Sequence, residues 1–383
     1  MRVLVTSWPG TGHIHPLVPL SAELQSAGHD VLWATGADAC AMVERYGFRA
    51  VSAGGSTRDR PALPEPVSAL AAASPVRERR RVLMPTIFGG IGARLMRDDL
   101  VRVVDDYRPD VIIHDMVEFA SAPVASARGI PHVTLAFGTA LPAALLAAVA
   151  PAVAQLWADE GLVPSADVGV YDHLYLHPLP LGFGQPPSAG TVRSVRPMHF
   201  DGGGVVREPD WVGAFGRDRP GVYVTFGTVM SAGAPWAAVI EAAGGLDADV
   251  VMTVGSKVDP AALGAVPENV RVEAYVPQTY LLNRAALVVS HSGAGTLFAA
   301  AARGIPQLCL PMGADQWENA DALARTGSGI TLEPEERQPD VIRRAVVSLL
   351  DGPEHRRAAK LLADEFAVLP HPGEHVTTIE ALT

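Results

Sequence analysis

A glycine-rich turn near the start of the chain carries a histidine that could act as a general base. The segment Trp8–Pro16 (WPGTGHIHP) follows a short apolar run and precedes an apolar-periodic stretch over Leu17–Ala27. This order predicts a buried strand, a tight turn and a helix, with His13 at the strand–helix junction. Histidine exchanges protons near neutral pH, so it can accept one from a hydroxyl group. Position alone leaves open that His13 caps the helix or binds a phosphate without taking part in chemistry.

An aspartate at the end of another buried strand is a candidate partner for His13. The sequence PDVIIHD predicts a strand over Val111–His114, and Asp115 follows at its carboxyl end. There Asp115 can orient the imidazole and stabilise the imidazolium that proton transfer creates. The alternative is that Asp115 only caps the helix that begins near Glu118 or Phe119. His114 points to the other face of the strand and is expected to be structural.

The strongest local signal is an anion-binding turn in the second half of the chain. A buried strand over Leu287–Ser290 ends at His291, and the turn SGAGT then opens a helix. Free amide groups at a helix N-terminus favour a diphosphate, and Gly293 and Gly295 allow it to approach closely. His291 and Thr296 can add hydrogen bonds to the phosphate oxygens. The pattern predicts nucleotide binding and leaves the reaction unspecified.

Adjacent polar residues after the next strand suit the hydroxyl groups of a sugar. Asp315 and Gln316 lie in PMGADQWEN and offer hydrogen-bond acceptors and donors, although Asp315 could instead cap the following helix. A D-x-D sequence at Asp247–Asp249 precedes a strand instead of following one, so we interpret it as a solvated turn. We expect no metal site, because two cysteines cannot build a zinc site.

Two halves of the chain repeat an alternation of strands and helices that would position these residues. In the first half we expect strands over 3–6, 31–35, 111–114 and 133–135, and helices over 17–27, 76–107 and 119–128. In the second half we expect strands over 222–226, 250–254, 287–290 and 307–310, and helices over 236–243, 296–302, 319–325 and 340–350. This alternation predicts an α/β fold of two doubly wound parallel sheets.

The expected domains are residues 1–201 and 220–366, with an interdomain linker rich in Pro and Gly over 202–219. The last segment, 367–383, is expected to pack back on the N-terminal domain. Ligands of open parallel sheets lie outside the carboxyl ends of the strands, so the two sheets are expected to face a cleft.

Composition narrows the classes of function. A formal charge of -11 over 383 residues argues against a nucleic-acid partner. The only two cysteines, Cys40 and Cys309, exclude a disulfide framework and fit a reducing cytoplasm. Residues 140–158 approach the length of a membrane span, but their many alanines and two prolines favour a buried helix pair over an anchor. We therefore expect a cytoplasmic protein without stable membrane insertion.

Together the motifs resemble the nucleotide-sugar-dependent glycosyltransferases of GT-B fold, specifically the bacterial branch that decorates polyketides and other natural products. The resemblance spans nearly the whole chain and rests on GTGHIHPLVPLSAELQSAGHDV, VYVTFGTV, YVPQTYLL, HSGAGT and GADQWENA. It implies two Rossmann-like domains, an inverting and metal-independent transfer of a hexose, and no cofactor besides the nucleotide-sugar co-substrate.

The resemblance also assigns site residues. It places the catalytic histidine at His13 and its acidic partner at Asp115. It places the nucleotide base at Tyr275, Val276 and Gln278. It places the diphosphate at Thr228, His291, Gly293, Gly295 and Thr296. It places the sugar at Asp315 and Gln316. Plant relatives have a tryptophan where this chain has Tyr275, and a glutamate for the ribose of UDP that this chain lacks. The resemblance therefore favours dTDP with a deoxysugar over UDP.

The acceptor implied is a bulky hydrophobic small molecule, bound by the segments Phe137–Trp157 and Val67–Phe88. Other functions on the same fold remain open: a nucleotide-sugar epimerase, a lipid-sugar transferase, or a non-catalytic nucleotide-sugar-binding partner. A lipid-sugar transferase should show a basic membrane face, but the run Arg77–Arg81 is explained more simply as a solvated helix face. A homodimer also remains open.

Overall fold

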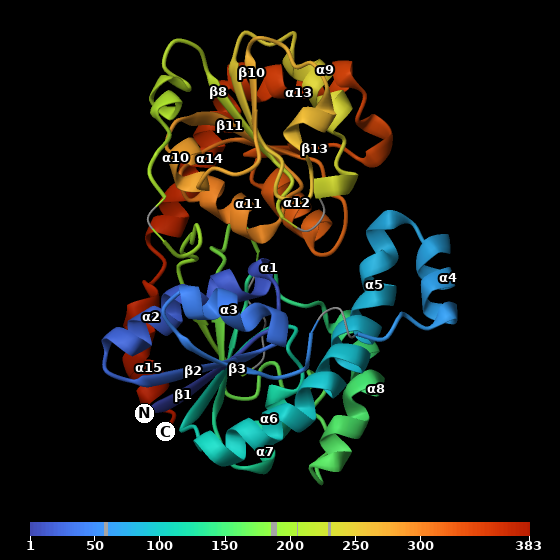
Figure 1. Ribbon diagram of the computed structural model, residues 1–383, viewed down its shortest axis with the longest axis vertical. Coiled ribbons are helices and arrows are strands. Elements are labelled where there is room, and N and C mark those ends of the chain that lie inside the picture. Colours follow the sequence, from blue (N-terminus) through green and yellow to red (C-terminus); the bar gives the residue numbers. More distant parts are fainter. Residues whose placement is uncertain (57–59, 185–189, 205, 229–230) are drawn as a thin grey trace. The chain divides into compact units, whose positions relative to one another are not determined.

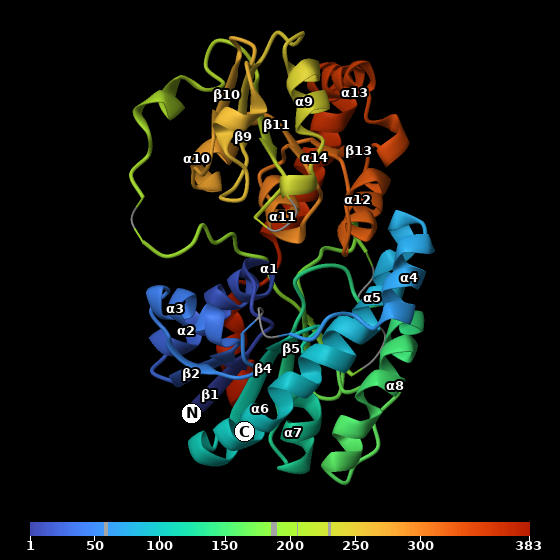
Figure 2. The same cartoon turned by 45° about the vertical axis from the view of Figure 1, so that its right-hand side comes forward.

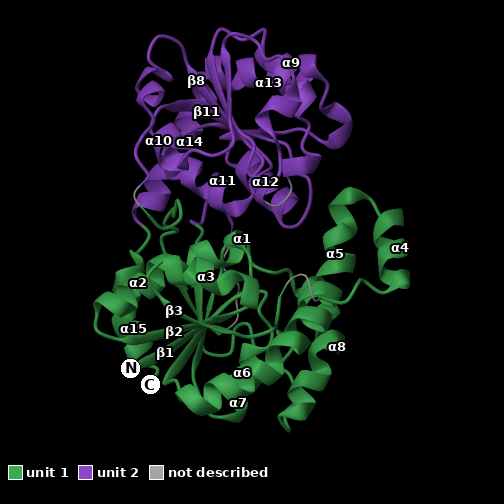
Figure 3. Cartoon of the chain, in the orientation of Figure 1, with its two compact units in different colours: residues 1–179, 186–204, 369–383 green, residues 180–185, 205–368 purple. Residues whose placement is uncertain are grey.

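A computed structural model describes residues 1–383 apart from 57–59, 185–189, 205 and 229–230. The chain divides into two compact units (Figure 3). The first contains residues 1–179, 186–204 and 369–383, and the second contains residues 180–185 and 205–368. The C-terminal segment thus belongs to the first unit.

The first unit is built on a seven-stranded parallel sheet. The strand order is β3-β2-β1-β4-β5-β6-β7. The strands are Arg2–Thr6 (β1), Asp30–Thr35 (β2), Arg49–Ser52 (β3), Val111–Asp115 (β4), His132–Leu135 (β5), Leu174–His177 (β6) and Thr191–Ser194 (β7). The strand order reverses at the β1–β4 pair, and this is where doubly wound sheets bind ligands.

Helices cover both faces of this sheet (Figure 2). One face carries α1 (Thr11–Ile14), α2 (Val18–Ser26), α3 (Ala37–Arg45) and the C-terminal α15 (Val376–Glu380). The other carries α6 (Ala93–Tyr107), α7 (Ser121–Ala127) and α8 (Ala143–Asp159). Successive strand residues point to opposite faces, so Leu4 joins the core under α6 while Val3 and Val5 join the core under α2.

Two expected helical segments differ from the sequence-based prediction. The stretch 76–107 is not one helix: a 3-10 turn and α5 (Arg79–Met84) lead into a π-helix over Pro85–Gly92, followed by α6. The expected helix pair over 140–158 is wrong, because α8 continues through Pro151 as one helix. Burial of Val149 and Val153 on either side of Pro151 offsets the hydrogen bond that a proline cannot donate.

A helical hairpin of α4 (Glu65–Ala73) and α5 extends from the rest of the first unit (Figure 1). Among the described residues, no helix combines the length and the apolar character needed to cross a membrane.

The second unit contains a six-stranded parallel sheet in the order β10-β9-β8-β11-β12-β13. The strands are Gly221–Thr225 (β8), Asp249–Thr253 (β9), Val270–Glu273 (β10), Ala285–Ser290 (β11), Gln307–Cys309 (β12) and Gly329–Thr331 (β13). The order reverses at the β8–β11 pair, which makes this pair the switch point of the second sheet.

The helices of the second unit also lie on both faces of their sheet (Figure 2). One face carries α9 (Trp236–Ala243) and α13 (Pro339–Asp351), and the other carries α10 (Gln278–Leu282) and α11 (Ala294–Ala301). Helices α12 (Gln316–Arg325) and α14 (Pro353–Ala367) complete the unit. The expected doubly wound α/β architecture is confirmed in both units.

Candidate functional site

The structure brings His13 and Asp115 together at the switch point of the first sheet. Strands β1 and β4 pair in register, with Thr6 opposite His114, so the loops that follow them start side by side. Nδ1 of His13 lies 3.4 Å from Oδ2 of Asp115; the His13 side chain is 19% exposed and that of Asp115 is fully buried. This distance exceeds that of a strong hydrogen bond, and base–orienter contacts in unliganded enzymes often shorten when substrate binds.

Asp115 is held in place by two backbone amide groups. Its Oδ2 accepts a hydrogen bond from the amide of Trp8 at 2.9 Å, and its Oδ1 accepts one from the amide of Val117 at 2.8 Å. The bond to Val117 closes a turn before α7, which begins at Ser121. The interpretation of Asp115 as the cap of that helix is therefore wrong. Its carboxylate instead links the loop after β1 to the loop after β4.

Aromatic side chains surround the His13 imidazole. The ring of Phe137 meets it edge-on at a centroid distance of 5.0 Å, and the ring of Phe88 lies at 5.7 Å. Trp8 packs against Phe88 at 4.8 Å and fits there because a Cβ on Gly92 would lie 1.8 Å from its ring. Phe88, Phe137 and Trp8 are each partly exposed, so they present an apolar surface beside a polar, proton-accepting ring.

In the second unit, the ring of His291 packs against two glycines, and a larger residue at either glycine position would clash with it. A Cβ on Gly227 would lie 2.9 Å from the ring, and a Cβ on Gly293 would lie 2.5 Å from its Nε2. Burial lowers the pKa of His291 to about 4, so the ring is neutral at pH 7. A neutral imidazole can donate one hydrogen bond. His291 can therefore contact a phosphate as a hydrogen-bond donor, without a formal charge.

Two residues expected near the nucleotide contact each other directly. Nε2 of Gln278 donates to Oγ1 of Thr296 at 3.1 Å, which joins α10 to the first turn of α11. Near them, Val276 is buried and Tyr275 is 56% exposed. Thr228 lies in the turn after β8 and is exposed, and Gly295 is exposed in the first turn of α11.

The residues expected to bind the sugar differ in their accessibility. Oδ2 of Asp315 accepts a hydrogen bond from Nδ2 of Asn319 at 2.9 Å, and its side chain forms no cap of α12. Oε1 of Gln316 accepts from the amides of Met312 and Gly313, at 2.6 and 2.9 Å. The carbonyl oxygen of buried Gln316 therefore stabilises its own loop, and Asp315 is the better placed of the two for a ligand.

Asn319 is a residue that the sequence-based prediction missed. Its Nδ2 donates both to Asp315 and to the carbonyl of Ser292, the latter at 3.1 Å, so it ties the loop after β12 to the loop after β11. The available signal was its position one helical turn after Asp315.

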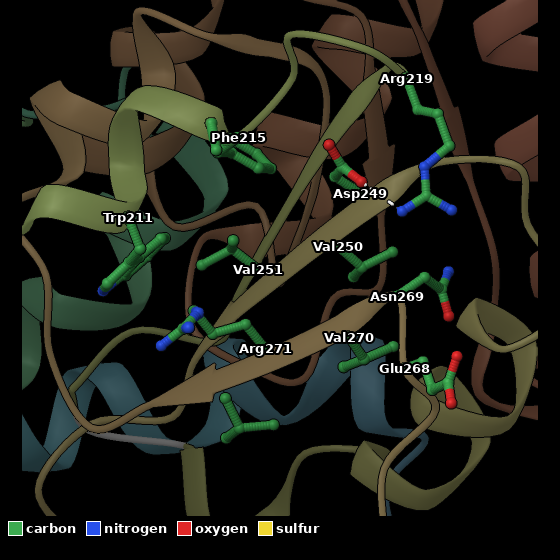
Figure 4. A pocket seen from close by; sticks show the side chains of 12 residues that line it. Trp211, Phe215, Arg219, Asp249, Val250, Val251, Glu268, Asn269, Val270 and Arg271 are labelled. Atoms are coloured by element: carbon green, nitrogen blue, oxygen red, sulfur yellow. Dashed lines mark hydrogen bonds and ion pairs between the residues drawn. The ribbon is translucent and has the colours of Figure 1, made fainter.

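A separate pocket of about 510 Å³ lies in the second unit, beside the starts of β9 and β10 (Figure 4). Arg219 and Asp249 form an ion pair of 2.6 Å in its lining, and the guanidinium of Arg271 lies 4.5 Å from the centre of the Trp211 ring. Because Asp249 and Val270 begin their strands, the pocket is at the opposite end of the sheet from His291. It is therefore not part of the candidate site.

The fold and these loops define a GT-B glycosyltransferase, and comparison with known proteins supports the same class. Residues 22–227 match the N-terminal domain described as erythromycin biosynthesis protein CIII-like, and residues 237–382 match the corresponding C-terminal domain. The chain belongs to this family of bacterial natural-product glycosyltransferases and is itself a glycosyltransferase.

Individual relatives cover the whole chain. The chain is 33% identical over 390 residues to L-demethylnoviosyl transferase of Streptomyces niveus, covering 97% of this chain and 96% of that protein. The glycosyltransferase VinC in complex with dTDP is 26% identical, with a TM-score of 0.82 and coverage of 100% and 99%. The spinosyn rhamnosyltransferase SpnG complexed with spinosyn aglycone is 25% identical, with a TM-score of 0.83 and coverage of 99% and 100%.

Proposed function

We propose that this enzyme transfers a deoxyhexose from a dTDP-sugar to a hydroxyl group of a hydrophobic natural-product acceptor, with inversion at the anomeric carbon. The observation that carries the proposal is the His13–Asp115 pair at the β1–β4 switch point, next to a partly exposed aromatic surface. The dTDP complex of VinC and the aglycone complex of SpnG support the two substrate classes.

In the proposed reaction, His13 is the general base. Its Nδ1 faces Asp115, so Nε2 accepts the proton of the acceptor hydroxyl while the oxygen attacks the anomeric carbon. The bond from that carbon to the diphosphate oxygen breaks, and its electron pair leaves with dTDP. Asp115 stabilises the imidazolium that forms. A single displacement without a covalent enzyme intermediate inverts the configuration.

The second unit would hold the donor substrate. We assign the diphosphate to the N-terminus of α11, with Thr228, His291, Gly293, Gly295 and Thr296 around it. We assign the nucleotide base to Tyr275, Val276 and Gln278, and the sugar to Asp315, with Gln316 as a second contact that chiefly supports the loop. Amide groups and the helix dipole would stabilise the leaving diphosphate, so the proposed reaction needs no metal ion.

We also propose that the enzyme acts in the cytoplasm. Support comes from Cys40 and Cys309, both of which carry free thiols.

The test replaces His13 with alanine and measures transfer and dTDP binding separately. General-base catalysis contributes about 10²–10⁴-fold, so His13→Ala should lower kcat by at least about 10²-fold. Calorimetric dTDP affinity should not change, because the donor residues are assigned to the other unit. His15→Gln is the matched control, since Nε2 of His15 contacts the Tyr46 hydroxyl at 2.9 Å and its ring packs against Phe200. Near-normal turnover of His13→Ala would refute the assignment of the base.

The product identifies the reaction class. A scan of dTDP-sugars and aromatic or macrocyclic acceptors should give a glycoside whose anomeric configuration, read by NMR coupling, is opposite to that of the donor. An epimerised nucleotide sugar, a glycolipid, or dTDP-sugar binding without any product would instead support the respective alternative.

A further inference from the structure

A second carboxylate, that of Glu118, lies buried in the loop that carries Asp115. The Glu118 residue is only 4% exposed. Its Oε1 accepts hydrogen bonds from the amides of Ala120 and Ser121, at 2.6 and 3.3 Å. Its Oε2 accepts from Oγ1 of Thr6 at 2.8 Å and from the hydroxyl of Ser121. These four donors offset the cost of removing the carboxylate from water.

The contacts of Glu118 reach another strand. Thr6 is the last residue of β1, 112 positions earlier in the chain, and Trp8 follows it by two residues. The amide of Trp8 donates to Asp115. From the loop after β4, Glu118 therefore holds the end of β1, and Asp115 holds the loop that follows β1. The amide of Glu118 also donates to the carbonyl of Asp115 at 3.1 Å, which closes a turn between the two residues.

Helix capping explains only half of these contacts. The amides of Ala120 and Ser121 lie at the start of α7, and Oε1 alone satisfies both of them. A capping role does not require Oε2 to meet a hydroxyl on β1. In addition, the turn that leads to His13 is closed by its own backbone, because the amides of His13 and Ile14 donate to the carbonyl of Gly10 at 3.0 and 2.9 Å. Contacts such as that of the Trp8 amide with Asp115 tie this turn to the loop after β4.

We propose that Glu118 is a positioning residue for glycosyl transfer. By tying Thr6 to the loop after β4, it keeps the carboxylate of Asp115 beside Nδ1 of His13. This inference rests on the proposed function, in which Asp115 orients the base. It predicts that loss of the Thr6–Glu118 contact slows the chemical step, because Asp115 then orients His13 less well. The affinity for the donor should not change.

The test is Thr6→Val, which at nearly constant volume removes the contacts of the Thr6 hydroxyl with Glu118 and with the Ser121 hydroxyl, and leaves Oε1 of Glu118 on α7. We expect kcat to fall about tenfold, because a small misplacement of catalytic groups has a large effect on rate. The KM for the dTDP-sugar should stay within about twofold of the wild-type value. Thr134→Val is the matched control: Thr134 is fully buried in the same sheet, and its hydroxyl donates to the carbonyl of Val170 and lies 3.2 Å from Nε2 of His114, the residue before Asp115. An equal loss of kcat in this control would overturn the proposal.

A double-mutant cycle with Asp115→Ala shows whether the effect passes through Asp115. If it does, Thr6→Val should cost nothing further once Asp115 is gone. A further tenfold loss in that background would overturn the positioning role while leaving Asp115 as the orienter. Full activity of Asp115→Ala alone would instead refute the role of Asp115, and the positioning role with it.

The conservative variant Glu118→Gln offers an independent check. Its carbonyl oxygen can replace Oε1, and its amide group can donate to the Thr6 hydroxyl, so it should retain most of kcat. Glu118→Leu should lose at least about tenfold. Equal kcat values for the Gln and Leu variants would contradict the proposal.

Discussion

Two buried histidines of the first unit should make its stability fall steeply in mild acid. Burial lowers the pKa of His177 to about 4 and that of His132 to about 2, the latter with help from neighbouring His114 and His173. Neither ring nitrogen of His177 has a hydrogen-bond partner among the described residues. In the unfolded chain, both residues should protonate near the ordinary value of ~6.5.

The sign and size of the effect follow from these values. Because the unfolded state binds the protons first, the stability is fully present above pH 6.5 and is lost as the pH falls below it. At pH 5 an unfolded histidine lies about 1.5 pH units below its pKa, which favours unfolding by about 2 kcal/mol. Since the pKa of each folded histidine is at or below about 4, His132 and His177 together remove about 4 kcal/mol between pH 7 and pH 5. That loss is a large part of the total stability of a domain, about 5–15 kcal/mol.

The assay is urea unfolding at pH 7 and at pH 5, on the wild type and on His177→Phe. Phenylalanine keeps the aromatic contact with Tyr175, whose ring lies 6.1 Å from that of His177. The variant should lose about 2 kcal/mol less than the wild type between the two pH values. Equal losses in the two proteins would refute the reasoning, because they would mean that His177 protonates as readily in the folded state as in the unfolded state.

Two further predictions concern the substrates. Gly293→Ala should weaken dTDP binding, measured by calorimetry, at least about tenfold, because its Cβ would lie 2.5 Å from Nε2 of His291. The control Gly213→Ala should bind dTDP normally, because its Cβ would meet nothing within 4 Å. Normal affinity of Gly293→Ala would place the diphosphate elsewhere. Phe137→Ala should raise the KM of the acceptor about tenfold and leave the KM of the donor unchanged, since Phe137 borders His13. A change confined to the donor KM would contradict the assignment of Phe137 to the acceptor site.

The architecture was largely predictable because buried parallel strands read as continuous apolar runs. Strands β1, β4, β8 and β11 all have that character, and each was expected within a residue or two of its observed bounds. Strands β3, β7, β10 and β13 were missed because each is short, lies at an edge of its sheet and lacks a long apolar run. Strand β6 was missed as well. The π-helix over Pro85–Gly92 was missed because its apolar residues also fit the helical period.

The sequence by itself determined which residue types follow the strand ends. A histidine after β1, an aspartate at the end of β4 and a glycine-rich turn after β11 are local features, and the strand-end rule is enough to select them. The tertiary structure decided which of these residues meet and how closely. Thr6 meets Glu118 across 112 positions of the chain and Trp8 meets Asp115 across 107, through contacts that depend on the pairing of β1 with β4. No local pattern encodes such a contact, because the register of two distant strands is set by the packing of the whole sheet.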